Sequence, residues 1–147
     1  MPDTPRSPFA YAILRVVPRL DRGEFLNAGV VLLCRPRRFL AARIHLDRER
    51  LAALAPHADP DLALARLEAL AAVAAGDPDA GPIARMTRAE RFHWIVAPAS
   101  TIVQPSEVHT GMTADPAQML DHLFATLVEL EGRESAAAAA PGRADTA

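Results

Sequence analysis

A short run of apolar residues constrains the fold of this chain more than any other feature. Residues 28–34 read AGVVLLC and contain no charged side chain. The run is far shorter than the roughly 20 residues with which a helix spans a bilayer. Its length and its valine and leucine content favour a β-strand buried on both faces, although periodicity alone leaves a buried helix open.

The segments on either side of this run alternate between two faces, as strands do. Phe9, Tyr11, Ile13, Arg15 and Val17 share one face of a predicted strand over residues 9–17. Residues 39–46 alternate in the same way. Because short polar connections join the three strands, an antiparallel meander is the simplest arrangement.

Aspartate residues mark the starts of three predicted helices. An aspartate before a helix accepts hydrogen bonds from the first free backbone N–H groups. The predicted helices cover residues 48–55 after Asp47, residues 60–75 after Asp59, and residues 115–131 from Asp115. Pro60 at the first position and Gly76 after the last support the bounds of the second helix.

The remaining pattern completes the expected architecture. Residues 92–97 (FHWIVA) are aromatic and β-branched and are predicted as a fourth strand. We therefore expect the α+β class: an antiparallel sheet of about four strands with the helices over 60–75 and 115–131 packed on one face. One domain is expected over residues 9–131, between a disordered leader (1–8) and a low-complexity, disordered tail (132–147).

The residue types exclude some chemistry. All 16 basic residues are arginines, so catalysis that needs a lysine, as in Schiff bases and phosphate-loop sites, is excluded. Motifs for phosphate loops, dinucleotides and hydrolase nucleophiles do not occur, and we expect no cofactor. The five histidines and the single cysteine, Cys34, show no metal-ligand spacing, so we expect no metal.

Charge and cysteine content bear on partners and compartment. A formal net charge of -2 lacks the basic excess of a nucleic-acid binder. A lone cysteine indicates a reducing compartment. Residues 1–8 contain no apolar core of a signal peptide. We therefore expect a cytoplasmic protein with no membrane partner and no nucleic-acid partner.

One candidate site lies at the end of the meander, where the loop over residues 21–27 joins two strands. Arg15 and Arg43 fall on strand faces with apolar neighbours, and an arginine there needs a carboxylate or an anionic ligand. The residues expected at this end are Arg15, Asp21, Glu24, Asn27, Arg43 and His45. Two interpretations stay open: an internal ion-pair network, in which Glu24 binds Arg15 or Arg43, or a site for a ligand or partner.

A second candidate is the stretch over residues 104–111, within a long segment of little regular pattern. Irregular segments of this length often carry function, and His109 with Glu107 has the groups for acid–base chemistry. The alternative is a structural loop that Val108 anchors over the sheet. Separately, the arginines at 35, 37 and 38 predict a solvated turn, with a phosphate-binding patch as the alternative.

Two segments carry a resemblance to a known family. RGEFLNAGVVL (residues 22–32) and VQPSEVHTGMTADP (residues 103–116) resemble the bacterial family called domain of unknown function 3037, over roughly residues 9–131. The resemblance implies a small cytoplasmic α+β protein with no established enzymatic activity and no catalytic residues to transfer. It also implies genes that neighbour HipA-type kinases, and hence a partner or regulator of such a kinase.

Two functional hypotheses follow. The first is a non-catalytic interaction or regulatory module, with a HipA-type kinase among its candidate partners. The alternative is a small-anion-binding protein or an enzyme that uses Arg15, Glu24, Asn27 and Arg43 together with His109. This composite site requires both candidate segments to meet in one pocket.

Overall fold

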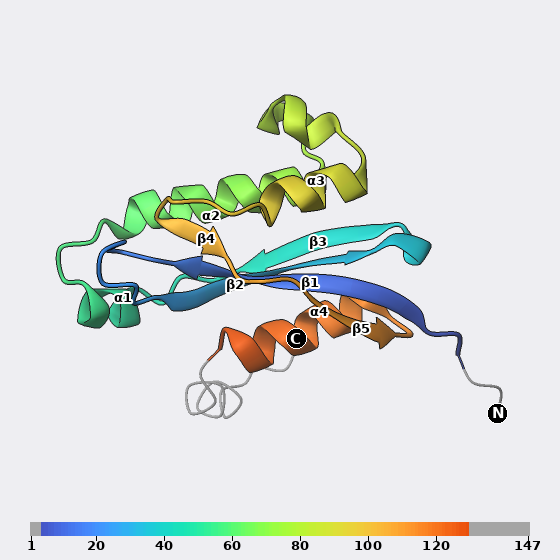
Figure 1. Ribbon diagram of the computed structural model, residues 1–147, viewed down its shortest axis with the longest axis horizontal. Helices are drawn as coiled ribbons and strands as arrows, with labels where there is room; N and C mark the ends of the chain where they lie inside the picture. The colour runs from blue at the N-terminus through green and yellow to red at the C-terminus, as the bar shows by residue number, and fades with distance from the viewer. Residues whose placement is uncertain (1–3, 130–147) are drawn as a thin grey trace, which may run out of the picture.

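The chain folds around a five-stranded antiparallel sheet. The computed structural model describes residues 4–129. Strands β1 (Ser7–Val16), β2 (Leu26–Cys34) and β3 (Phe39–Ile44) form the predicted meander, in the order β3-β2-β1. Two further strands, β4 (Val103–Pro105) and β5 (His109–Thr113), pair with opposite halves of β1 (Figure 1). The prediction of an α+β fold on an antiparallel sheet is thus confirmed.

Helices cover both faces of this sheet. In Figure 1, α2 (Pro60–Ala75) and α3 (Arg88–Ile95) lie above the sheet, and α4 (Pro116–Leu127) lies below it. The expectation that the helices over 60–75 and 115–131 share one face is therefore wrong. The reason lies in β2: it is buried on both faces, as predicted, so each face needs its own cover.

The sheet separates two hydrophobic clusters. Alternate residues of β1 and β2, including Leu14 and Val31, pack with Leu67 of α2 and Phe92 of α3. The strand residues between them face the other way and pack against Leu120 and Phe124 of α4; these are chiefly Phe9, Val30, Leu32 and Cys34. The two-residue period of the strands thus sorts the apolar side chains between the two layers.

Capping side chains fix the helix starts as predicted. The carboxylate of Asp59 accepts hydrogen bonds from the backbone of Asp61 and Leu62, and Gly76 ends α2 in the left-handed conformation at φ 71°. Asp115 caps α4 through the backbone N–H of Gln118. A short helix, α1 (Arg48–Leu54), begins in the same way after Asp47. The predicted bounds 60–75 agree with α2.

The predicted strand over residues 92–97 is wrong, because α3 occupies this part of the chain. Thr87 and Glu90 form a reciprocal capping box that starts the helix. Phe92 and Ile95, three residues apart, then face the core, while Trp94 points outward. The aromatic and β-branched composition favoured a strand, but the cap and the helical spacing of the buried residues decide the conformation.

The segment that follows α3 is a sheet edge rather than an irregular loop. Residues 103–105 form β4 and residues 109–113 form β5. Between the two strands, Ser106 holds β1 by two hydrogen bonds: its Oγ accepts from the N–H of Ile13, and its N–H donates to the carbonyl of Ile13, both at 2.8 Å. Val108 is 43% exposed, so it does not anchor the segment as expected.

The first strand of the structure begins inside the predicted leader. β1 begins at Ser7, two residues before the predicted strand. The last described helix ends at Leu127, and the predicted tail over residues 132–147 lies outside the described residues.

Among residues 4–129, no helix has the length and hydropathy to cross a membrane. Three short 3-10 turns complete the described part of the chain: Arg35–Arg37, Pro78–Ala80 and Pro82–Arg85.

Candidate functional site

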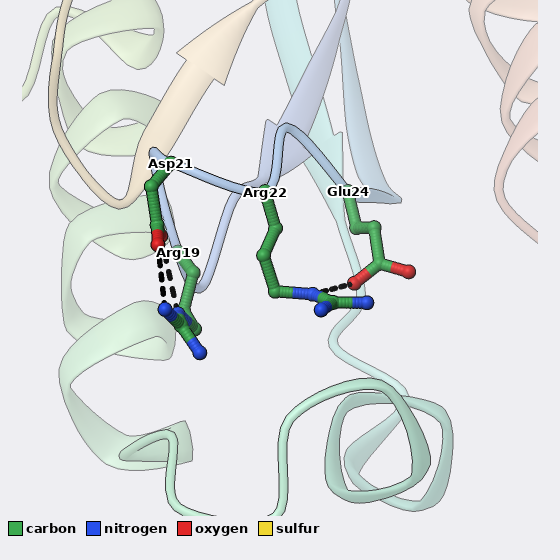
Figure 2. Close-up of polar contacts among 4 residues, drawn as sticks. All are labelled: Arg19, Asp21, Arg22 and Glu24. Carbon is green, nitrogen blue, oxygen red and sulfur yellow. Dashed lines mark hydrogen bonds and ion pairs between the residues drawn. The ribbon is translucent and has the colours of Figure 1, made fainter.

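The acidic residues of the β1–β2 loop are neutralised within the loop itself. The Nε and Nη2 atoms of Arg19 donate to the carboxylate of Asp21 at 3.1 and 2.5 Å, and Arg22 Nε donates to Glu24 at 2.6 Å. Figure 2 shows each arginine beside its own acidic partner. The hydrogen bond from Arg19 lowers the pKa of Asp21, and that from Arg22 lowers the pKa of Glu24. Both carboxylates are thus held in the charged form.

Arg43 forms an ion pair with a carboxylate on α4. Its Nη1 lies 2.9 Å from Asp121 Oδ1, and its guanidinium carbon lies 4.3 Å from the centre of the Phe124 ring. The expectation that Glu24 binds Arg15 or Arg43 is therefore wrong. An open depression of about 800 Å³ runs along this side of α4 and includes the Arg43–Asp121 pair. Arg43 fastens α4 to the sheet.

His109 lies apart from the loop. It stands on β5 opposite Tyr11, with the two ring centres 5.3 Å apart, and its Nε2 is 3.4 Å from Glu107. Tyr11 and Arg15 are four residues apart on β1, which corresponds to roughly 13 Å along a strand. Because β5 pairs with the first half of β1 and Glu24 follows its far end, the structure does not bring Glu24 and His109 into one site.

Arg15 and Asn27 do meet, on directly opposite positions of β1 and β2. The guanidinium carbon of Arg15 lies 4.2 Å from the centre of the Phe25 ring. Asn27 Nδ2 donates to the backbone carbonyl of Leu127, near the end of α4, at 2.9 Å. Arg15 Nε and Asn27 Oδ1 are buried and have no hydrogen-bond partner among the described residues. Of the predicted cluster, these two residues keep unused polar atoms.

The arginine turn at residues 35–38 has a structural task. Arg37 Nε donates to Ser7 Oγ at 3.0 Å, and its Nη2 donates to the carbonyl of Pro5 at 2.6 Å. Arg38 closes the turn in the left-handed conformation, with φ 53°. Arg37 therefore ties the start of β1 to the β2–β3 turn. Within residues 4–129, no cluster of three or more His, Cys, Asp or Glu side chains is arranged to hold a metal ion.

A groove that the sequence did not predict lies between α2, the end of α3 and β4. It has a volume of about 350 Å³ and is mostly apolar, and its walls include Arg66, Leu70, Trp94, Pro98 and Pro105. Trp94 is 48% exposed. In the described part of the chain, Arg66 forms no ion pair or hydrogen bond. A sequence signal for this groove does exist. Thr87 and Glu90 have the three-residue spacing of a capping box, which predicts a helix from residue 88 and therefore places Trp94 on a helix.

With this geometry established, comparison with known families identifies the chain. The family model described as "Protein of unknown function (DUF3037)" matches residues 11–128. The chain belongs to the DUF3037 family. No curated protein and no solved structure gives a match.

In this DUF3037 protein, the segment over residues 22–32 is tied into the fold at several points. Gly23 adopts a φ of 70°, which lets the loop turn back toward β2. Phe25 lies against Arg15, and Asn27 binds the end of α4. Gly29 leaves room for β3, because a Cβ atom there would lie 2.9 Å from the carbonyl oxygen of Arg43. The segment therefore joins the loop, the sheet and α4.

Proposed function

We propose that this DUF3037 protein is a non-catalytic interaction module whose protein partner docks in the groove beside Trp94. The observation that carries the proposal is a half-exposed tryptophan on the wall of an apolar groove. Tryptophan and arginine dominate the binding energy of protein interfaces, because both bury a large surface and retain a polar group. Contiguous apolar patches and grooves on a folded surface often mark interaction sites, and Trp94 lies in the wall of such a groove.

The charge of the groove indicates the kind of segment that fits it. Arg66 is exposed at the rim, and the walls contain no acidic side chain among the described residues. An apolar side chain packed on Trp94 and Leu70, followed by a carboxylate that reaches Arg66, would match both features. We therefore infer an amphipathic partner segment with an acidic residue next to its apolar anchor.

The candidate site of the β1–β2 loop supports an interaction role more than acid–base catalysis. A general base needs a free position within hydrogen-bonding distance of the proton that it takes. Asp21 and Glu24 are instead held by Arg19 and Arg22, and His109 lies elsewhere on the sheet. The composite site of the enzyme hypothesis is thus not assembled in this structure.

The family resemblance supports a HipA-type kinase as the first partner to test. We expect the purified full chain to bind the kinase from the same host, and Trp94→Ala to weaken the dissociation constant about 30-fold, or about 2 kcal/mol. Arg66→Glu should weaken binding to a similar extent, because it opposes an acidic segment. Titration calorimetry measures both effects.

Matched controls lie away from the groove. Met112→Ala removes an equally exposed apolar side chain from β5, and Arg35→Glu reverses a charge at the β2–β3 turn. Both controls should bind like the wild type. If the kinase does not bind at micromolar concentrations, the kinase is the wrong partner. If every host protein retained by the wild type is also retained by Trp94→Ala, the groove is not the docking site.

A further inference from the structure

Two polar atoms without partners lie on neighbouring strands, at the end of the sheet where the β1–β2 loop begins. Arg15 and Asn27 are direct cross-strand partners, so their side chains project from the same face, with Cβ atoms roughly 5 Å apart. Arg15 Nε can only donate a hydrogen bond, and Asn27 Oδ1 can only accept one. Both atoms are buried and unpaired within the described chain. Unpaired buried groups of this kind are costly and rare in folded proteins.

The surrounding contacts hold Arg15 in place without neutralising it. Its guanidinium stacks over Phe25, at 4.2 Å from the ring centre, and Phe25 is itself 46% exposed. Within residues 4–129, Arg15 forms no ion pair and no hydrogen bond through its side chain. The acids of the adjacent loop are occupied by Arg19 and Arg22. The planar fork of Arg15 is thus held by Phe25 and has no polar partner among residues 4–129.

The orientation of Asn27 is also fixed. Its Nδ2 donates to the carbonyl of Leu127, which settles which end of the amide faces α4. The Oδ1 atom is therefore an acceptor with a set direction. The carbonyl end of α4 contributes a partial negative charge near this point, which favours the positive charge of Arg15.

A donor and an acceptor side by side define the chemistry of the ligand. A carboxylate matches the guanidinium fork with two parallel hydrogen bonds. Asn27 Oδ1 requires an N–H or O–H group on an atom close to that carboxylate. Acetate, or the dianion of a phosphate monoester, offers acceptors only and leaves Asn27 unmatched. An amino-acid carboxylate with its neighbouring N–H satisfies both atoms.

We propose that Arg15, Asn27 and Phe25 form a binding site for an α-amido or α-amino carboxylate. Arg15 binds the carboxylate, Asn27 accepts from the neighbouring N–H, and Phe25 provides the apolar wall. The ligand is either a free small molecule or the C-terminal residue of a peptide, since both present the same groups. This site is separate from the Trp94 groove, so either can fail without the other.

The test is an NMR titration of the full chain. The readouts are the ¹⁵N–¹H signals of Arg15 Nε and Asn27 Nδ2, observed with four probes: N-acetylglycine, N-acetyl-trialanine as the free acid, acetate, and N-acetylglycinamide. We expect saturable shifts with the two acids that carry an N–H. Acetate should bind at least about tenfold more weakly because it leaves Asn27 unpaired, and the amide should not bind because it lacks the charge.

The relative affinities of the two acids distinguish the sources. Tighter binding of N-acetyl-trialanine indicates a peptide C-terminus, and equal binding indicates a small molecule. Arg15→Met should abolish the shift at Asn27, whereas Arg22→Met, which removes the same charge from the same end of the sheet, should preserve it. Arg15→Lys keeps the charge without the fork and should bind weakly.

Thermal melting separates a binding role from a structural one. Arg15→Met removes an unpaired buried donor, so we expect its melting temperature to equal or exceed that of the wild type. The proposal is overturned if no probe gives saturable shifts at Arg15 and Asn27, as expected where a bound water alone joins these atoms. It is also overturned if Arg15→Met binds the acids as the wild type does.

Discussion

At the scale of single residues, Gly29 shows how closely the central strands approach one another. It stands in β2 beside an irregularity in the register of β1, where Leu14 pairs with Gly29 but Arg15 pairs with Asn27. A Cβ atom on Gly29 would lie 2.9 Å from the carbonyl oxygen of Arg43 and 3.0 Å from the side chain of Ile44. Backbone atoms in the middle of a sheet cannot move aside cheaply, so the position has no room for a side chain.

We expect Gly29→Ala to lower the free energy of unfolding by about 1–3 kcal/mol, the usual cost of overpacking a core. Gly23→Ala is the control. Gly23 has a positive φ, but no atom lies within 4 Å of the place that a Cβ methyl would take, so only the backbone conformation opposes the change, at about 1 kcal/mol. Urea unfolding measures both. If the unfolding free energy of Gly29→Ala lies within about 0.5 kcal/mol of the wild-type value, β3 can move aside to admit the methyl group.

Single side chains also show which features of the candidate site the sequence cannot predict. Strand alternation singled out Arg15 and Arg43, because each falls among apolar neighbours on a strand face. Of the two, Arg43 has a carboxylate partner among residues 4–129, which the alternation could not name. Asp121 lies 78 residues from Arg43 along the chain and reaches it only because α4 crosses the second face of the sheet. Side-chain pairing between distant elements depends on packing that a local pattern does not contain.

At the scale of elements, α3 depends on its cap more than on its composition. Thr87 Oγ1 accepts from the N–H of Glu90, and the Glu90 carboxylate accepts from the N–H of Thr87. At the other side of the helix, the guanidinium of Arg91 is buried against Gly76, at the carbonyl end of α2. A cation is favoured there by the dipole of α2. These contacts place Trp94 on the outer surface.

We expect Thr87→Ala to cost about 1 kcal/mol of unfolding free energy near neutral pH, the typical cost of losing a cap. The hydrogen bonds of the box hold the pKa of Glu90 below its ordinary value of 4.5. A carboxylate with a lowered pKa in the folded state stabilises it above the unfolded pKa, and this contribution is lost as the pH falls through the folded pKa. The difference between variant and wild type should therefore shrink in acid.

Urea unfolding at about pH 7 and about pH 3 tests this expectation. Thr110→Ala, on the exposed strand β5, is the control and should change stability little at either pH. An effect of Thr87→Ala that is equal at both pH values would show that the Thr87 hydroxyl does not depend on the charge of Glu90.

Elements differ in how well the sequence predicts them, for a physical reason. The bounds of α2 follow from Asp59, Pro60 and Gly76, which act within a few residues of the helix ends. By contrast, β5 contains Thr, Gly and Met and is mostly exposed, so no burial pattern marks it as a strand. It is ordered by pairing with β1, which lies far earlier in the chain. Signals within a few residues of its ends therefore predict a helix such as α2, whereas an edge strand such as β5 is predictable only once its partner strand is known.

At the scale of the whole molecule, the sheet couples two hydrophobic layers, and its strand β2 contributes buried side chains to both. Its residues alternate between the cluster under α2 and α3 and the cluster under α4. Loss of either cluster exposes one face of the same strand. The two layers should therefore unfold together, in a single cooperative transition.

The only tryptophan of the chain makes this expectation measurable. Trp94 reports on the layer of α2 and α3, whereas Leu120 is buried in the layer of α4. We expect Leu120→Ala to lower the free energy of unfolding by about 2–5 kcal/mol. Because β2 joins the layers, the urea midpoint from Trp94 fluorescence should fall by the same amount as the midpoint from circular dichroism. Leu62→Ala, at an exposed position on α2, should leave both midpoints nearly unchanged. A Trp94 transition that stays at the wild-type midpoint in Leu120→Ala would show that the layer of α2 and α3 folds without α4.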